Sequence, residues 1–258
     1  MQTSGQLLYE FPFSEKVRFY LRFETLARRY LWFVEQNSPI AHQSAIGTLF
    51  DLSDVAARSD LKNDLVKELS REQRDLEAQR AQSAGDAVTS DELTRRIEEL
   101  KLVSRQVTQI VGRSGQNIRD LQWLQLVRNR QPLPGGTCEF DMPFLHFWLA
   151  QSAEERRREL RELSATLSPT INAVAIILRH LRSTTEMHNA HAVKGVAQVP
   201  VNGRNYSLCR IWIRSGSNLI PEVSANKFAL FIRLSRPDEQ HILHYTTEEI
   251  DFQIGLCH

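Results

Sequence analysis

The sequence has few cysteines, no long apolar run and almost no net charge. Its three cysteines, Cys138, Cys209 and Cys257, are odd in number and far apart, which favours reduced thiols over a disulfide framework. The longest strongly apolar stretch is Ala173–Leu178, far short of the roughly 18 residues that a membrane span needs. The N-terminal segment lacks the basic and apolar regions of a secretory signal. We therefore expect a cytoplasmic protein.

The formal net charge of +1 means that the whole molecule is not a strong polyanion binder. Any electrostatic function must be local. Of the 32 basic residues only six are lysines, and the remaining 26 are arginines. The planar arginine fork suits carboxylate and phosphate contacts, but a codon bias of the genome would produce the same excess.

Signatures of catalysis are also absent. The sequence contains no G-x-S-x-G, no phosphate-binding loop and no G-x-G-x-x-G after a strand. Two H-x-x-H spacings, His188/His191 and His241/His244, lack a further ligand at a familiar spacing. We expect no enzyme, no cofactor and no metal site. Arginines interleaved with aromatic residues leave a nucleic-acid-binding module as the alternative function.

Helical patterns dominate to about residue 190. Expected helices run from a Ser14 cap to Glu35, from Pro39, over Leu61–Arg80, over Asp91–Val111, over 117–130, from an Asp141 cap, from a Ser152/Glu155 capping box and from Pro169. The small polar stretch at 81–89 is expected to be a loop.

After about Ala192 the apolar period changes from 3.6 to 2. Four runs predict strands at Val193–Val201, Tyr206–Ile213, Lys227–Leu234 and Ile250–Leu256, and Asn202-Gly203 is a strong hairpin signal. The order of elements predicts an α+β fold. A helical domain at 1–190 is followed by a small antiparallel β domain at 191–258, and one face of that sheet must pack on the helices.

The first helix carries an unusual group of arginines. A helical projection places Phe19, Phe23, Leu26, Ala27, Tyr30 and Val34 on the core face. Arg18, Arg22 and Arg29 cluster to one side of it, with Val17, Leu21 and Trp32 forming a weaker apolar strip beyond them. Such arginines either line a groove or interface for carboxylates, or lie on an ordinary surface with their stems along apolar neighbours.

His146 is the only titratable side chain in the stretch "MPFLHFWL". Considered alone, a histidine among apolar residues is more often a hydrogen-bonded core residue than a binding residue.

Three stretches together resemble the ZapD family of bacterial cell division proteins. They are "MQTSGQLLYEFPFSEKVRFYLRFETL", the block "LVRNRQPLPGGTCEFDMPFLHFWL" and the late "FALFIRLSRPD". The resemblance spans nearly the whole chain. It implies a helical domain followed by a β domain, a homodimer, and a non-enzymatic protein at the mid-cell division ring that binds the tubulin-like protein FtsZ and bundles its filaments.

The resemblance also implies a basic pocket for the acidic and apolar C-terminal tail of FtsZ. The matching positions are Arg18, Arg22 and His146, with Arg119, Arg128 and Arg130 as weaker candidates. Gln122 stands where a basic residue is expected in the family, which makes the pocket less positive unless Arg119 compensates. The 81–89 loop is longer than the family pattern. Neither nucleic-acid binding nor direct membrane insertion is implied.

Overall fold

The computed structural model describes residues 5–58, 60–82, 87–201, 203–226 and 228–258, and the chain folds as two units. The helical unit comprises Leu21–Leu178, and the β unit comprises Met1–Tyr20 together with Arg179–His258. Helices α1 (Glu15–Glu35) and α9 (Ser168–Ser183) each continue from one unit into the other. These boundaries differ from the predicted division at residue 190, because a strand near the N-terminus belongs to the β unit. The α+β class is confirmed.

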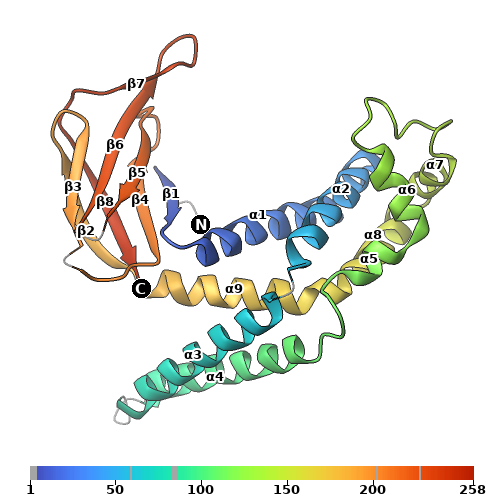
Figure 1. Ribbon diagram of the computed structural model, residues 1–258, viewed down its shortest axis with the longest axis horizontal. Coiled ribbons are helices and arrows are strands. Elements are labelled where there is room, and N and C mark those ends of the chain that lie inside the picture. Colours follow the sequence, from blue (N-terminus) through green and yellow to red (C-terminus); the bar gives the residue numbers. More distant parts are fainter. Residues whose placement is uncertain (1–4, 59, 83–86, 202, 227) are drawn as a thin grey trace. The chain divides into compact units, whose positions relative to one another are not determined.

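The helical unit holds most of the expected helices (Figure 1). In chain order after α1 they are α2 (Pro39–Ala56), α3 (Leu61–Gln82), α4 (Ala87–Thr108), α5 (Gln116–Asp120), α6 (Gln122–Arg130), α7 (Pro143–Ala150), α8 (Ala153–Ser164) and the 3₁₀ turn η1 (Ala165–Leu167). Two predicted caps are confirmed. Ser14 Oγ accepts the Val17 N–H at 3.2 Å, and Ser152 with Glu155 forms the capping box of α8.

Several predicted helix details are wrong. The single helix expected over 117–130 is divided at Leu121, whose extended backbone separates α5 from α6. Helix α4 begins at Ala87 rather than Asp91, so part of the expected 81–89 loop is helical and residues 83–86 lie outside the described residues. Met142, not Asp141, precedes α7 and no side chain caps it; the Asp141 carboxylate lies 3.7 Å from Arg130.

The buried face of α1 is rotated slightly from the predicted one. Phe23, Ala27, Tyr30 and Val34 are buried as expected, whereas Phe19 and Leu26 are only half-buried. Val17 and Tyr20, which lie one turn apart, take their place in the core.

A buried arginine fastens α8 to its neighbours in the helical unit. Arg156, 3% exposed, donates to Nδ1 of buried His42 at 2.9 Å, to the Leu149 carbonyl at 2.7 Å, to the Asn37 carbonyl at 3.0 Å and to the Gln151 carbonyl. These carbonyls follow or end α1 and α7, where helix dipoles favour a positive charge. Burial lowers the pKa of His42, so that its ring is neutral and accepts this bond.

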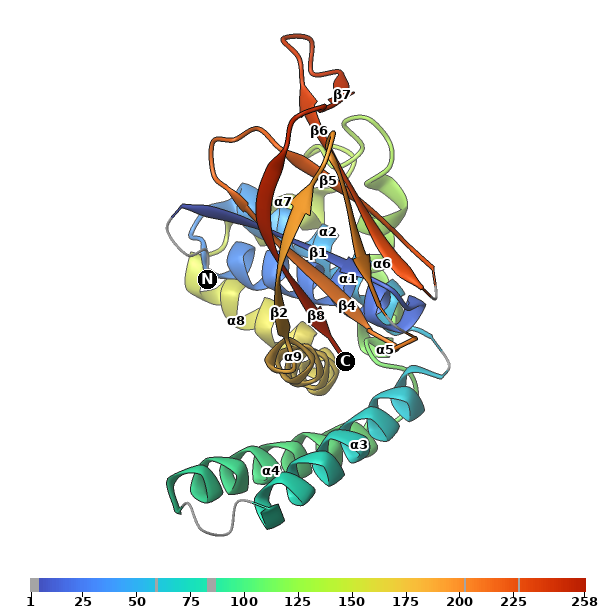
Figure 2. The same cartoon turned by 90° about the vertical axis from the view of Figure 1, so that its left-hand side faces the viewer.

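Helices α3 and α4 form a hairpin and lie side by side in Figures 1 and 2. The apolar seam is built from residues at helical spacing on both helices: Leu61, Leu65, Leu69, Leu76, Leu93, Ile97, Leu100, Val103 and Val107. Two carboxylates share the seam, Glu68 at 7% and Glu72 at 2% exposure. Burial, reinforced by Glu68, raises the pKa of Glu72 to about 8.

Two antiparallel sheets make up most of the β unit. The first has the order β1-β4-β8-β2, and the second has the order β3-β6-β5 with β7 also paired to β6. The strands are β1 (Gln6–Pro12), β2 (Glu186–Ala192), β3 (Val196–Pro200), β4 (Leu208–Arg214), β5 (Ile220–Ala225), β6 (Ala229–Pro237), β7 (Leu243–Tyr245) and β8 (Ile250–Cys257). One apolar core takes side chains from both sheets. The sheets therefore cover each other, whereas the sequence led us to expect helices over the sheet.

The four predicted β runs correspond to β3, β4, β6 and β8, although Lys227 lies outside the described residues. The predicted hairpin at Asn202-Gly203 does not join two paired strands, because β3 and β4 belong to different sheets; Asn202 itself lies outside the described residues. Strand β1 was not predicted. Its partner β4 is about 200 residues away in the sequence, so no local signal marks the pairing.

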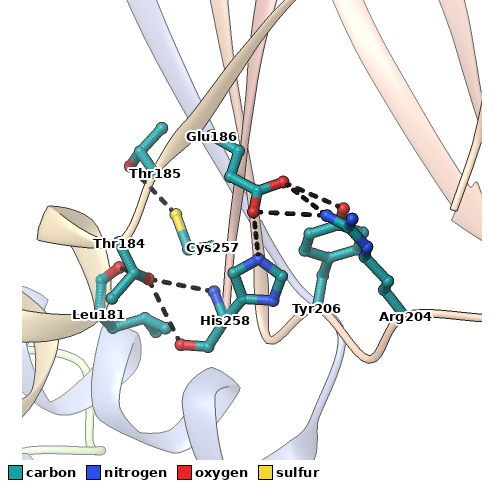
Figure 3. A network of polar contacts seen from close by, with 8 residues as sticks. All are labelled: Leu181, Thr184, Thr185, Glu186, Arg204, Tyr206, Cys257 and His258. Atoms are coloured by element: carbon teal, nitrogen blue, oxygen red, sulfur yellow. Dashed lines mark hydrogen bonds and ion pairs between the residues drawn. The ribbon is translucent and has the colours of Figure 1, made fainter. Parts of the chain in front are cut away.

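The ends of β2 and β8 are tied together by a polar network (Figure 3). The Glu186 carboxylate accepts from His258 Nε2 at 2.9 Å and from Arg204 Nη1 at 3.3 Å. The His258 ring lies beside that of Tyr206, with centroids 4.6 Å apart. The hydrogen bond from His258 lowers the pKa of Glu186. Each group has a partner within the network, which is typical of a structural contact.

Candidate partner-binding surface

Three exposed arginines of α1 in the helical unit, Arg22, Arg28 and Arg29, make no ion pair among the described residues. Arg22 and Arg29 lie about 20° apart on the helix projection, on a side about 80–120° from buried Phe23 and Tyr30. Both are exposed. Within the described part of the chain, neither forms an ion pair or a side-chain hydrogen bond. Their guanidinium donors are available to carboxylates from outside.

Arg18 lies one turn before Arg22, on the segment of α1 that belongs to the β unit. Its Nε is 3.1 Å from Glu15 Oε1, and the two side chains are 44% and 87% exposed. Exposed pairs of this kind contribute little free energy, about 0–1 kcal/mol. Glu15 is therefore a weak competitor for an external carboxylate.

Arg119 is held inside the helical unit. It donates to the Ser53 carbonyl at 2.9 Å, to Ser53 Oγ at 2.7 Å, to the Ser114 carbonyl at 3.2 Å and to Gln116 Oε1 at 3.1 Å. Burial lowers the pKa of its guanidinium. These bonds are those of a residue that joins α2 to α5.

Arg128 has an acidic partner of its own. Its Nη2 lies 2.8 Å and 2.6 Å from the two carboxylate oxygens of Asp54 on α2. The side chains are 41% and 48% exposed, so water screens the pair. Gln122 is exposed at the first position of α6.

His146 lies on the exposed side of α7, with 56% of its side chain exposed and Nδ1 3.8 Å from Glu139 Oε1. The alternative of a core histidine is therefore wrong. The neighbouring rings define an α7 aromatic surface, Phe140, Phe144 and Phe147, which are 84%, 50% and 61% exposed. Phe144 contacts Trp123 and Phe147 at centroid distances of 5.4 and 6.2 Å. Sequence reasoning missed this exposure, because an apolar run in a short helix is more often buried.

One histidine of each H-x-x-H spacing has an acidic partner. His191 and His244 pair with Asp251 and Asp238, each at 2.8 Å, instead of with the second histidine of their spacing. No cluster of three or more His, Cys, Asp or Glu side chains suited to a metal occurs among the described residues. The three cysteines are free thiols, and burial raises the pKa of Cys209 to about 12. A thiol of such high pKa is a poor nucleophile.

A concave region of about 640 Å³ lies where α4, α5 and α9 approach one another in the helical unit. Carboxamides such as Gln106, Gln109 and Asn172 line it together with Arg113. Its lining among the described residues contains no carboxylate and no histidine. The region can donate and accept hydrogen bonds but has no pair of groups suited to acid–base catalysis.

No described helix is both long enough and apolar enough to cross a membrane.

Comparison with known proteins agrees with the resemblance seen in the sequence. The family described as "ZapD: Cell division protein" matches residues 21–233. A cell division protein ZapD of Ralstonia pickettii (strain 12J) is 39% identical over 252 residues, covering 97% of this chain and 99% of the relative. One of Chromobacterium violaceum (strain ATCC 12472) is 37% identical over 250 residues, covering 96% and 98%. The chain belongs to the ZapD family of cell division proteins.

Proposed function

We propose that this protein binds the C-terminal tail of FtsZ through the exposed arginines of α1 and cross-links FtsZ filaments at the division ring. The observation that carries the proposal is the pair Arg22 and Arg29, exposed and without intramolecular partners in the described residues. Membership of a family of cell division proteins supplies the biological setting. The role requires neither catalysis nor a cofactor.

Tail carboxylates would first meet Arg22, whose donors have no partner among the described residues. Arg18, in the β unit, is a separate candidate: exchanging Glu15 for a tail carboxylate would cost little because that pair is exposed. Arg128 would exchange Asp54 in the same way, and His146 would add a donor from α7. Arg119 contributes its positive charge while its donors hold α2 and α5.

Bundling follows if the protein is a cytoplasmic homodimer with one tail site on each protomer. Two sites would tether two filaments, and each filament presents many tails. A weak contact then suffices, because tethering raises the effective concentration of the next tail.

Fluorescence anisotropy of a labelled FtsZ tail peptide tests the proposal. We expect saturable binding by the wild type and its loss in Arg22→Glu, with an unchanged circular dichroism spectrum and oligomeric state. A random oligonucleotide is the control. Binding to the oligonucleotide but not to the peptide would replace the tail proposal with the nucleic-acid-binding alternative.

Salt provides a second readout. Exposed charge pairs are screened with a Debye length of about 10 Å at 0.1 M, so tail binding and filament bundling should both weaken as sodium chloride is added. Bundling that persists unchanged at high salt would contradict capture of the tail by exposed arginines.

A further inference from the structure

Trp32 lies at the end of the same exposed face of α1 as the free arginines. Helical projection places Arg22, Thr25, Arg29 and Trp32 within about 80° of one another, and we call these four residues the α1 stripe. Trp32 is 61% exposed. Its ring meets that of Phe33 edge-on, with centroids 5.3 Å apart, which supports the indole from one side.

The stripe combines the two residue types that most often dominate binding energy at interfaces, arginine and tryptophan. Trp32 makes no side-chain hydrogen bond within the described residues. Thr25 donates its hydroxyl to the Leu21 carbonyl at 2.8 Å, so its hydrogen-bond donor is used within α1. A partner that fits this face has an apolar side chain for the indole and carboxylates for the two guanidiniums.

Helix geometry sets the spacing of those groups. At 1.5 Å rise per residue, Arg29 lies about 5 Å and Arg22 about 15 Å from Trp32 along the axis. An extended peptide advances about 3.3 Å per residue. The complementary peptide therefore has one acidic residue one or two positions from its apolar residue and another four or five positions from it.

We propose that the α1 stripe binds an acidic peptide in this register, with Trp32 as the anchor for its apolar side chain and Arg29 and Arg22 as the two carboxylate sites. The inference rests on the proposed function in that the tail of FtsZ is the expected source of the peptide. Charge complementarity selects an acidic peptide, because the two arginines lack acidic partners in the described part of the chain.

Two labelled probes test the stripe, the FtsZ tail and a designed peptide. The designed peptide carries one leucine, an aspartate at the next position, a second aspartate four positions after the leucine, and glycine or serine elsewhere. The reversed peptide covers the opposite chain direction, and a version with both aspartates moved to one end is the scrambled control. We expect the full-length protein to bind one of the two registered peptides and not the scrambled one.

Matched variants separate the stripe from general surface effects. Trp32→Ala and Arg29→Glu should each weaken binding at least about tenfold. Tyr245→Ala removes a ring of similar exposure, 60%, from β7, and Arg74→Glu makes the same charge change on an exposed residue of α3, away from the stripe. Both controls should change binding less than about threefold.

Each outcome decides one of the two proposals. If Arg22→Glu abolishes tail binding but Trp32→Ala leaves both peptides unaffected, the tail function stands and the stripe is overturned. If the tail does not bind while a registered peptide binds through Trp32, the stripe stands and the tail function fails. If neither binds, both fail. If Trp32→Ala changes the sedimentation of the unliganded protein, the face is a contact between copies of this chain and the peptide proposal is overturned.

Discussion

Arg156 of α8 and Arg29 of α1 belong to the same helical unit but differ in every contact. Arg156 is 3% exposed, and its guanidinium is surrounded by His42 and three carbonyl oxygens. Arg29 is exposed and has no such partner within the described residues. An arginine whose donors are all used within the fold contributes to stability. An arginine whose donors have no partner within the fold can bind the carboxylates of another molecule, which makes it the better candidate for function.

Removing Arg156 should produce the largest loss of stability. Arg156→Met keeps the apolar stem but leaves His42 Nδ1 and the carbonyls of Leu149, Gln151 and Asn37 without their donor. Each buried acceptor left unsatisfied costs about 1 kcal/mol or more, so we expect about 3 kcal/mol less free energy of unfolding in urea titrations. Arg158→Met, a 71% exposed arginine of the same helix, is the control and should change stability by less than about 0.5 kcal/mol. Loss of tail binding in a fully stable Arg156→Met protein would contradict the distinction between the two arginines.

In the hairpin of α3 and α4, by contrast with Arg156, a buried glutamate has an oxygen atom without a hydrogen-bond partner among the described residues. The atom is Oε2 of Glu72, and burial raises the pKa of Glu72 from 4.5 to about 8. Because the folded pKa lies above the unfolded one, folding favours the protonated form, and stability is lost as the pH rises from about 4.5 to about 8. Glu72→Gln should remove that loss and stabilise the protein by up to about 3 kcal/mol at pH 7, at 1.4 kcal/mol per pKa unit.

Thermal melts of Glu72→Gln at pH 5 and pH 9 measure this effect. The gain in melting temperature should be small at pH 5 and large at pH 9. Glu98→Gln, a 62% exposed glutamate of the same hairpin, is the control and should show no such pH dependence. An equal gain at both pH values would mean that Glu72 is ionised in the folded protein throughout this range.

Contacts local in sequence could be predicted, and long-range contacts could not. The Ser152/Glu155 capping box and the start of α2 at Pro39 depend on three or four neighbouring residues, and the structure confirms them. Strand β1 depends on β4, about 200 residues later. The break at Leu121 lies two residues after Arg119, which is anchored to Ser53, 66 residues earlier. Helical spacing places Arg156 on the face of Leu160 and Leu163. Its partners, His42 and the Asn37 carbonyl, lie 114 and 119 residues earlier, so the sequence does not show what binds the buried guanidinium.

The candidate site shows the same limit. Helical spacing correctly grouped Arg22 and Arg29 on an exposed side of α1, because the projection depends only on sequence position. It could not show which cations have acidic partners. Arg128 is paired with Asp54, 74 residues away, and that pairing is invisible to any local pattern. The free donors of α1 are therefore a property of the fold as a whole.

The smallest expected effect concerns the ion pair between Arg128 and Asp54. Removing Asp54 tests whether this pair keeps Arg128 from binding the tail as the α1 arginines do. Asp54→Asn removes the carboxylate that lies 2.6 Å from Arg128 Nη2 while keeping a side chain of the same size. Because the pair is exposed, stability should fall by less than about 1 kcal/mol. If Arg128 belongs to the tail site, its released charge should strengthen tail binding about two- to fivefold at low salt, and the gain should vanish at high salt as screening increases.

Asp60→Asn, which removes a carboxylate beside Arg58 instead, is the matched control and should leave tail binding unchanged. Equal strengthening by both variants would show that only the overall charge matters, whereas no strengthening by Asp54→Asn would exclude Arg128 from the site and leave tail recognition to α1.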